Sequence, residues 1–377
     1  MINILTIDLE DYYQVSAFDS VVKREDWDKY ESRIERNTYR LLKMLHECKS
    51  NVSANASNVS PQTSNLSPYA SCLTTNECVK ATFFCLGWIA ERYPDLIREI
   101  HRQGHEIACH SYDHRLVYHM TPNEFREDIR KSRQILEDTV SDDVVGYRAP
   151  SYSITIKSQW AFEVLMEEGF RYDSSIFPIH HDVYGFPTAP RFPFLISMNG
   201  NNAFEFQMLN SDFGETQLTQ VFPINSTNPS NPSNPSTPRN SGAAPEHSVT
   251  PNSELPTPNC LLEFPISTLR ICGQNVPISG GGYFRLFHYS LIKKGLKRIN
   301  EGEGKPFIFY LHPWELDQDQ PKVNSASFKS RFRHYINLDK TEPKFRRLLT
   351  DFRFSSISNV LNSNTATPQP ICSLSGL

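Results

Sequence analysis

The sequence begins with a group of acidic side chains that could hold a cation. Asp8, Glu10 and Asp11 lie within four positions, directly after the strand-like segment of residues 1–7. Three carboxylates this close together repel one another unless a cation or a shared proton relieves the repulsion. Taken alone, the group is also consistent with a solvated turn after a strand. A metal site therefore needs further ligands elsewhere in the chain.

A pair of histidines supplies such ligands. His110 and His114 follow the alternating segment Glu106–Cys109. Two imidazoles four residues apart can lie on one side of a helical turn and bind a single ion. A catalytic zinc site typically has three protein ligands and an open position for water. One carboxylate of the first group would complete a His-His-carboxylate set, and the residues alone leave open which carboxylate this is.

Three more polar groups follow apolar or strand-like segments. They are Arg148–Tyr152, Asp173–Ser175 and Leu311–Trp314. Taken singly, Arg148 is more typical of a surface ion pair, and His312 of a hydrogen-bonded structural histidine. Their occurrence together with the acidic and histidine groups favours one shared site.

These groups need a scaffold that brings them together. Residues 81–84 and 307–311 are apolar runs typical of buried strands. Helices are predicted for an apolar stripe that ends near Gly104, for a segment that begins with the capping box Thr121–Glu124, and for residues 155–169. Strands separated by helices predict a parallel sheet, here a (β/α) barrel or a variant with fewer strands. In such barrels the chemistry collects at the carboxyl ends of the strands, where the polar groups are found.

Composition limits the partners and the location. The formal net charge is −4, whereas nucleic acid binding usually needs a concentrated basic surface. Nucleic acid is therefore not an expected partner. No run of about 18 apolar residues is present, so no transmembrane segment is predicted. The first residues show no signal-peptide pattern, and we expect a cytoplasmic protein. The eight cysteines form no C-x-x-C pair and are predicted to be free thiols.

Two stretches differ in composition from the rest of the chain. Residues 49–78 are crowded with Ser, Asn and Thr, and residues 224–259 contain Asn-Pro-Ser repeats. Both have too little apolar surface to offset the entropy lost on ordering, so we predict disordered surface insertions.

Five motifs, in this order, resemble the polysaccharide deacetylase family with NodB homology. They are Thr6–Asp11, His110–His114, Arg148–Tyr152, Asp173–Ser175 and Leu311–His312. The resemblance implies an α/β fold, a distorted (β/α) barrel expected to have seven strands. It covers residues 1–355 as a single deacetylase domain and leaves 356–377 as a flexible tail.

A narrower resemblance is to the exosortase-associated subgroup found beside exopolysaccharide biosynthesis genes. It rests on the segments Asp8–Val15, Gly280–Arg285, His312–Asp317 and Phe332–Tyr335. This resemblance implies hydrolysis of N-acetyl groups from an N-acetylhexosamine-containing polysaccharide or its precursor, with peripheral contact to the exopolysaccharide machinery. Two alternatives stay open: a metal-dependent amidohydrolase acting on a small amide, and a catalytically inactive carbohydrate-binding relative.

The family resemblance also implies roles for individual residues. It implies a divalent ion, zinc or else cobalt or nickel, bound by Glu10, His110 and His114, with Asp11 as the alternative to Glu10. The implied catalytic residues are Asp8 as general base, Arg148 as its partner, and His312 as general acid oriented by Asp173. The residues expected to bind substrate are Tyr152, Gly282, Tyr283 and Trp314. Two departures from the family pattern are the acid-x-acid spacing of Asp8 and Glu10 and the extra Ser151 before Tyr152.

Overall fold

The computed structural model describes residues 1–48, 78–181, 184–198, 204–208 and 260–364. Apart from Cys78, the predicted insertions 49–78 and 224–259 lie outside the described residues. Residues 365–377 also lie outside them.

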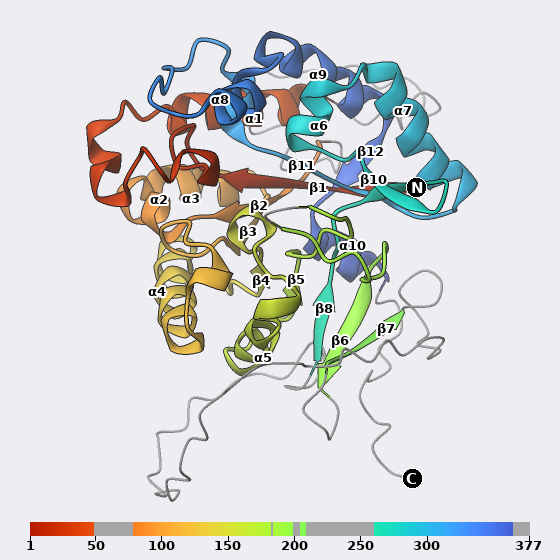
Figure 1. Cartoon of the computed structure of the whole chain (residues 1–377), viewed down its shortest axis with the longest axis horizontal. Coiled ribbons are helices and arrows are strands. Elements are labelled where there is room, and N and C mark those ends of the chain that lie inside the picture. Colours follow the sequence, from red (N-terminus) through yellow and green to blue (C-terminus); the bar gives the residue numbers. More distant parts are fainter. Residues whose placement is uncertain (49–77, 182–183, 199–203, 209–259, 365–377) are drawn as a thin grey trace, which may run out of the picture.

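A largely parallel sheet forms the centre of the molecule (Figure 1). In the described part of the chain, seven parallel strands follow the order β11-β1-β2-β3-β4-β5-β8, so the predicted α/β fold with seven parallel strands is confirmed. The antiparallel strands β6 and β7 extend the sheet beyond β8, β12 pairs with β1, and β9 and β10 form a separate hairpin. The strands are β1 (Ile2–Leu9), β2 (Thr82–Cys85), β3 (Glu106–Cys109), β4 (Gly146–Tyr147), β5 (Tyr172–Asp173), β6 (Phe194–Met198), β7 (Phe204–Met208), β8 (Cys260–Glu263), β9 (Thr268–Ile271), β10 (Gln274–Pro277), β11 (Ile308–Leu311) and β12 (Arg353–Ser355).

The parallel strands curl into a distorted barrel. Phe84 of β2, Tyr172 of β5 and Ile308 of β11 belong to one buried cluster, although their strands are far apart in the sheet order. No strand in the described residues pairs β8 with β11. Instead, Ser279 O accepts the backbone N–H of Tyr310 at 3.0 Å, and a β-bridge joins Gly280 to Tyr310. Irregular backbone thus stands beside β11 where a regular barrel would have a strand.

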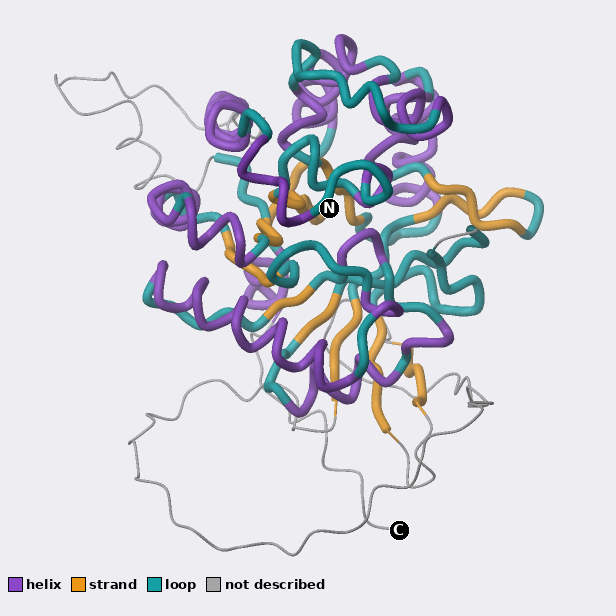
Figure 2. The backbone as a smooth tube through the Cα atoms, turned by 60° about the vertical axis from the view of Figure 1, so that its left-hand side comes forward, coloured by secondary structure: helices purple, strands orange, loops and turns teal. Residues whose placement is uncertain are grey.

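Helices surround the strands, as Figure 2 shows. The predicted capping box is confirmed: Thr121 accepts from the backbone N–H of Glu124, which in turn caps Thr121. The helix predicted for 155–169 starts with a separate 3-10 turn and becomes α-helical at Trp160. Among the described helices, none is both long enough and apolar enough to span a bilayer. The helices are α1 (Ile34–Glu47), α2 (Gly87–Arg92), α3 (Pro94–Arg102), α4 (Pro122–Val140), α5 (Trp160–Glu167), α6 (Gly281–Leu286), α7 (Tyr289–Lys297), α8 (Phe328–Tyr335), α9 (Thr341–Asp351) and α10 (Ile357–Asn364).

The two-residue period of the strands aims the polar groups inward. In β1, Leu5, Ile7 and Leu9 join the core that the helices cover, whereas Ile4 joins the cluster inside the barrel. Because successive side chains of a strand point to opposite faces, Asp8 lies on the same inner face as Ile4. The same alternation in β11 carries its inner face through Tyr310 to His312. Both polar side chains therefore lie at the carboxyl end of the barrel, as predicted.

Helix α10 corrects the predicted tail. A flexible segment was expected from residue 356, but Ile357–Asn364 is helical. Ile357 and Val360 are buried in the inner cluster, and the backbone N–H of Ile357 donates to Thr82 Oγ1 at 2.8 Å. Thr82 begins β2, so α10 covers the amino end of the barrel, opposite the polar groups. The burial of these two apolar side chains explains why the segment is ordered.

The cysteines follow the prediction only in part. The described thiols at Cys48, Cys85, Cys109 and Cys272 are free. Cys78, however, is disulfide-bonded, so the prediction of free thiols is wrong at this position.

Candidate active site

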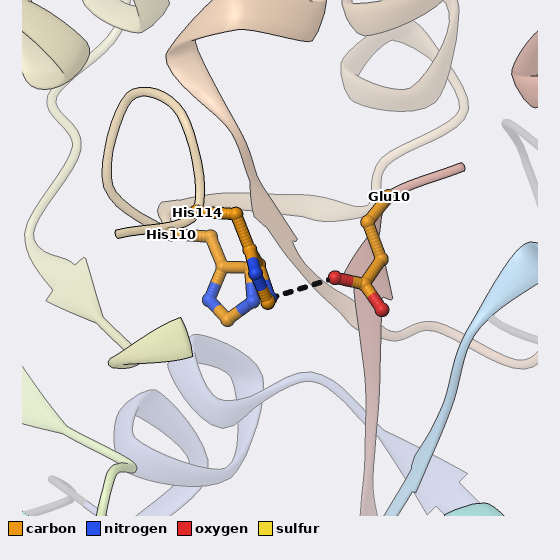
Figure 3. A group of neighbouring side chains, drawn as sticks. All are labelled: Glu10, His110 and His114. Carbon is orange, nitrogen blue, oxygen red and sulfur yellow. Dashed lines mark ion pairs between the residues drawn. The ribbon is translucent and has the colours of Figure 1, made fainter. Parts of the chain in front are cut away.

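Three predicted metal ligands meet at the carboxyl ends of β1 and β3 (Figure 3). One ligand atom from each of Glu10, His110 and His114 lies within 4.8 Å of the others, and all three side chains are buried. His114 Nε2 is 2.8 Å from Glu10 Oε2, and the two imidazole rings have centroids 5.5 Å apart. Burial acts to raise the pKa of Glu10, but the positive charges of His114 and His312 outweigh it and lower this pKa to about 2. Glu10 is therefore an anion facing two nitrogen ligands.

The two histidines are held by a loop and not by a helical turn. Ser111 and His114 both have positive φ angles, 65° and 59°, so the chain between the imidazoles is not helical as the spacing suggested. The loop is fixed at Ser111 O, which accepts from the backbone N–H of Gly87 at 2.9 Å and from Ser132 Oγ at 2.9 Å. A Cβ on Gly87 would lie 2.8 Å from Ser132 Oγ, which explains the glycine at the start of α2.

His110 is oriented by a backbone carbonyl. Its Nδ1 lies 2.7 Å from Arg148 O. Because a carbonyl can only accept, the proton is on Nδ1, and Nε2 is left as the ligand atom. Burial lowers the pKa of His110 to about 4, so the ring is neutral near pH 7, as metal binding requires.

Asp11 faces away from this group. Its Oδ2 accepts from Ser32 Oγ at 2.9 Å and from the backbone N–H of Arg33 at 2.8 Å, and its Oδ1 accepts from Tyr12 N at 2.9 Å. These bonds tie the end of β1 to the segment that leads into α1. The geometry therefore favours Glu10 over Asp11 as the carboxylate of the ligand group.

Asp8 and Arg148 form a buried ion pair beside the ligand group. Arg148 Nη1 donates to Asp8 Oδ1 at 2.7 Å and to Thr6 Oγ1 at 2.8 Å. Its Nε donates to the Ser174 carbonyl and its Nη2 to the Ser174 hydroxyl, so all three guanidinium nitrogens are held. Both side chains are almost fully buried. The Arg148 guanidinium therefore fixes the position of the Asp8 carboxyl.

His312 faces the carboxylates at the end of β1. Its Nε2 is 3.4 Å from Glu10 Oε1 and 3.7 Å from Asp8 Oδ2, while its Nδ1 is 2.7 Å from Glu315 Oε1. Burial acts to lower the pKa of His312, but the charges of Glu10 and Glu315 outweigh it and raise this pKa to about 9. The prediction that Asp173 orients His312 is wrong, because Glu315 takes that position.

Asp173 has a different neighbour, Glu263 at the end of β8. The two carboxyls lie on adjacent strands in register, and both are fully buried. Asp173 Oδ1 accepts from Ser175 Oγ at 2.6 Å, and Glu263 Oε1 accepts the backbone N–H of Ile176 at 2.9 Å. Burial raises the pKa of Asp173 to about 6 and that of Glu263 well above its usual range. Burial thus favours the protonated form in this pair of carboxyls.

Trp314 packs beside Glu10 and His312. The indole is 4% exposed, and its Nε1 donates to Glu10 Oε1 at 3.3 Å. The ring is stacked between His312 and His334, with centroid distances of 5.2 and 4.1 Å. The indole thus exposes little surface, and its contact with substrate stays a prediction.

The remaining predicted substrate contacts lie around the same end of the barrel. Tyr152 has a φ of 54°, directly after Ser151 at 50°, and this left-handed pair turns its ring toward Phe177 and Tyr310. Tyr152 is buried, and its hydroxyl has no hydrogen-bond partner in the described structure. Its backbone N–H donates to Ala149 O at 3.0 Å and is not a free oxyanion donor.

The glycines at the start of α6 divide into two kinds. A Cβ on Gly280 would lie 2.2 Å from Tyr310 O, and one on Gly281 would lie 2.3 Å from Tyr310 Oη, so both are required by close packing against β11. Gly282 has open space, with Arg285 Nη2 at 3.8 Å as its nearest neighbour, and Tyr283 is half-buried. Their contact with substrate stays a prediction.

Two segments of the chain match known protein families. Residues 60–165 match the model described as polysaccharide deacetylase, and residues 232–362 match one described as a domain of unknown function, DUF3473. Over that first segment the chain is similar to polysaccharide deacetylases. A peptidoglycan-N-acetylglucosamine deacetylase of Bacillus cereus is 34% identical over 87 residues, 22% of this chain and 31% of the relative. Chitin deacetylase 1 of Bombyx mori is 33% identical over 111 residues, 27% of this chain and 20% of the relative.

These matches with deacetylases are partial. The matched segments span no more than about a third of each relative's own length. Among solved structures, a polysaccharide deacetylase candidate from Mycobacterium smegmatis aligns over 98% of this chain and 94% of its own, with 15% identity and a TM-score of 0.48. His110, His114 and Arg148 fall inside the part matched by the deacetylase model, and His312 falls inside the part matched by DUF3473.

Proposed function

We propose that this chain is a metal-dependent hydrolase that removes N-acetyl groups from an N-acetylhexosamine-containing polysaccharide or its precursor. The observation that carries the proposal is the convergence of two groups at one end of the barrel. A buried Glu10–His110–His114 ligand group lies beside a buried carboxylate, Asp8, and a second imidazole, His312. Amide hydrolysis needs an activated water, a proton acceptor and a proton donor, and these groups suit all three needs.

The donor set fits a divalent ion of the zinc class. Two imidazoles and one carboxylate are the ligands of many catalytic zinc sites, and cobalt and nickel accept the same set. Glu10 Oε2 is buried and lies 2.8 Å from His114 Nε2, so the two atoms that would bind the ion already face each other. A bound ion would lower the pKa of a water molecule toward neutrality and polarise the amide carbonyl.

The chain's own residues then handle the protons. Asp8, held in place by Arg148, accepts a proton from the water as the water oxygen forms a bond to the acetyl carbon. The carbon–nitrogen bond breaks next, and its electron pair goes to the nitrogen. His312, which faces the site through Nε2, gives that nitrogen a proton. The products are acetate and the free amine of the sugar.

The proposed substrate class rests on the relatives. Two matched relatives are called a peptidoglycan-N-acetylglucosamine deacetylase and a chitin deacetylase, and both names specify glycans of N-acetylated amino sugars. The subgroup likeness adds a role in exopolysaccharide biosynthesis, with peripheral contact to that machinery. Separately, we propose a cytoplasmic location. We further propose that residues 1–355 act as one catalytic domain.

Acetate release is the test of this function. The full-length chain is stripped of metal, reloaded with zinc, cobalt or nickel, and given N-acetylglucosamine oligomers alongside small cyclic amides. We expect acetate from the oligomers and only with metal. Turnover of the cyclic amides alone would favour the small-amide alternative. Oligomer binding without acetate from any loaded form would favour an inactive carbohydrate-binding protein.

A further inference from the structure

The segment matched by DUF3473 contributes a connected set of side chains to the site. Arg285, Trp314, Glu315 and His334 all belong to it, as does His312. Their backbone elements are α6, the 3-10 turn Pro313–Leu316 and α8. By contrast, Asp8 and the three ligand residues lie outside this segment.

Glu315 links His312 to a buried cation. Its Oε1 lies 2.7 Å from His312 Nδ1, and the same oxygen accepts the backbone N–H of His312 at 3.1 Å. Its Oε2 lies 2.8 Å from Arg285 Nε. The Glu315 side chain is 0% exposed and that of Arg285 is 4% exposed. A buried carboxylate without a cation would be strongly destabilised, so Arg285 keeps Glu315 ionised and in place.

The surrounding rings leave this arrangement little freedom. Trp314 packs between His312 and His334, and the guanidinium of Arg285 lies 5.0 Å from the Trp314 ring centroid. Arg285 Nη1 also donates to the backbone carbonyl of His334. His334 is fixed in turn by Gln320, whose Oε1 is 2.7 Å from His334 Nε2. These contacts therefore fix both the position and the orientation of the His312 ring.

We propose that Arg285 and Glu315 are positioning residues that hold His312 with Nε2 toward the leaving nitrogen, and that this is what the segment matched by DUF3473 adds to the reaction. The inference rests on the proposed function, because it assigns a partner to the proposed general acid. A carboxylate bonded to Nδ1 sets the ring's orientation and balances the charge of the doubly protonated imidazole. When the carbon–nitrogen bond breaks, the proton on Nε2 goes to the nitrogen that receives the electron pair.

The leaving group separates this role from a structural one. An amine needs a proton to leave, whereas 4-nitrophenolate leaves without one. The zinc-loaded full-length protein is assayed with an N-acetylglucosamine pentamer and with 4-nitrophenyl acetate. We expect Glu315→Gln to lower kcat on the pentamer by about a hundredfold, with little change in KM and in bound zinc. On 4-nitrophenyl acetate we expect a loss of less than about threefold. Arg285→Lys should show the same pattern more weakly, because the ammonium keeps the charge without the fixed geometry.

A double-mutant cycle checks that Glu315 acts through His312. In a His312→Gln background, Glu315→Gln should cost nothing further, since residues that act as a unit are not additive. Additive losses would overturn the proposal, as would equal losses on both substrates or the loss of zinc from Glu315→Gln. Glu106→Gln is the matched control: Glu106 accepts hydrogen bonds from Thr82 and Tyr172 at the other end of the barrel. In Glu106→Gln, the rate on the pentamer and the rate on 4-nitrophenyl acetate should change by the same factor.

A readout without turnover keeps the inference distinct from the proposed function. In the metal-free protein, the ring N–H of His312 bonded to Glu315 should give a downfield proton signal that is missing in both Glu315→Gln and His312→Gln. If wild type hydrolyses neither substrate but shows this signal, the proposed function fails and the orientation of His312 stands. Absence of the signal in wild type would overturn the positioning role even if acetate is released.

Discussion

Glu10 and Asp11 are adjacent in the chain, yet their carboxylates serve different parts of the structure. Glu10 Oε2 lies 2.8 Å from His114 Nε2, inside the ligand group. Asp11 Oδ2 instead accepts the backbone N–H of Arg33, just before α1. Neighbouring side chains at the end of a strand point in opposite directions, and this alternation gives one carboxylate to the site and the other to the fold.

The first prediction separates these two carboxylates. Glu10→Gln should lower zinc affinity, because it removes the only anion of the ligand group. Asp11→Asn should keep the zinc but lower the free energy of unfolding by about 1–3 kcal/mol, because an amide cannot accept all the bonds that this carboxylate accepts. Zinc content by elemental analysis and unfolding in urea measure the two effects. Loss of zinc from Asp11→Asn, with zinc retained in Glu10→Gln, would reverse the assignment.

The second prediction concerns the proton acceptor. Asp8→Asn can still accept from Arg148 through its amide oxygen, so the fold and the bound zinc should survive. Acetate release should fall by at least about a hundredfold, because the amide cannot take a proton from water. Activity and zinc content are measured on the same preparation. An Asp8→Asn protein that keeps full activity would exclude Asp8 as the base.

The third prediction is a pH dependence of stability that comes from Asp173. Burial raises the pKa of this carboxyl from 3.8 to about 6. A group that binds its proton more tightly in the folded state stabilises the fold at low pH, below its unfolded pKa. That stabilisation is lost as the pH rises from about 4 to about 6. Asp173→Asn removes the titrating group. The unfolding free energy of the variant minus that of wild type should therefore increase as the pH rises over this range. Parallel curves would show that Asp173 does not titrate there.

The fourth prediction tests the covering helix α10. Ile357 is fully buried in the inner cluster, so Ile357→Ala should lower the free energy of unfolding by about 2–5 kcal/mol. Leu291 on α7 is 60% exposed, and Leu291→Ala should change stability by less than about 0.5 kcal/mol. Urea unfolding of both variants gives the comparison. Equal effects would mean that α10 does not contribute to the core.

Much of the site could be predicted because polar residues interrupt apolar periodicity at strand ends. Asp8 lies near the end of a buried strand, His110 and His312 each follow one, and parallel strands bring their carboxyl ends to one edge. The interior alternation then aims these side chains at a common point. The loop between His110 and His114 was not predictable from spacing, because two residues four apart satisfy a helical turn and a left-handed loop equally well.

The partner of His312 was missed although a local signal existed. His312 and Glu315 form a capping box around the 3-10 turn, with Glu315 bonding back to the backbone N–H of His312. A polar residue followed by Glu three positions later, with Pro between them, is the usual sign of such a start. Arg285 had no such signal, because it reaches Glu315 only through the tertiary fold. The same is true of Glu263, which meets Asp173 across a strand pair.

The position of β1 also determines when the barrel can close during synthesis. β1 pairs with β2 on one side and with β11 on the other. β11 is far away in the chain: the carbonyl of its Phe309 accepts from Thr6 Oγ1, 303 residues earlier. While the ribosome makes the intervening segments, this apolar strand has one edge without a partner. Contacts of such long sequence separation fold slowly, and open strand edges promote aggregation. Yield in a heterologous host should therefore depend on chaperone capacity and on slow growth at reduced temperature more than on codon choice.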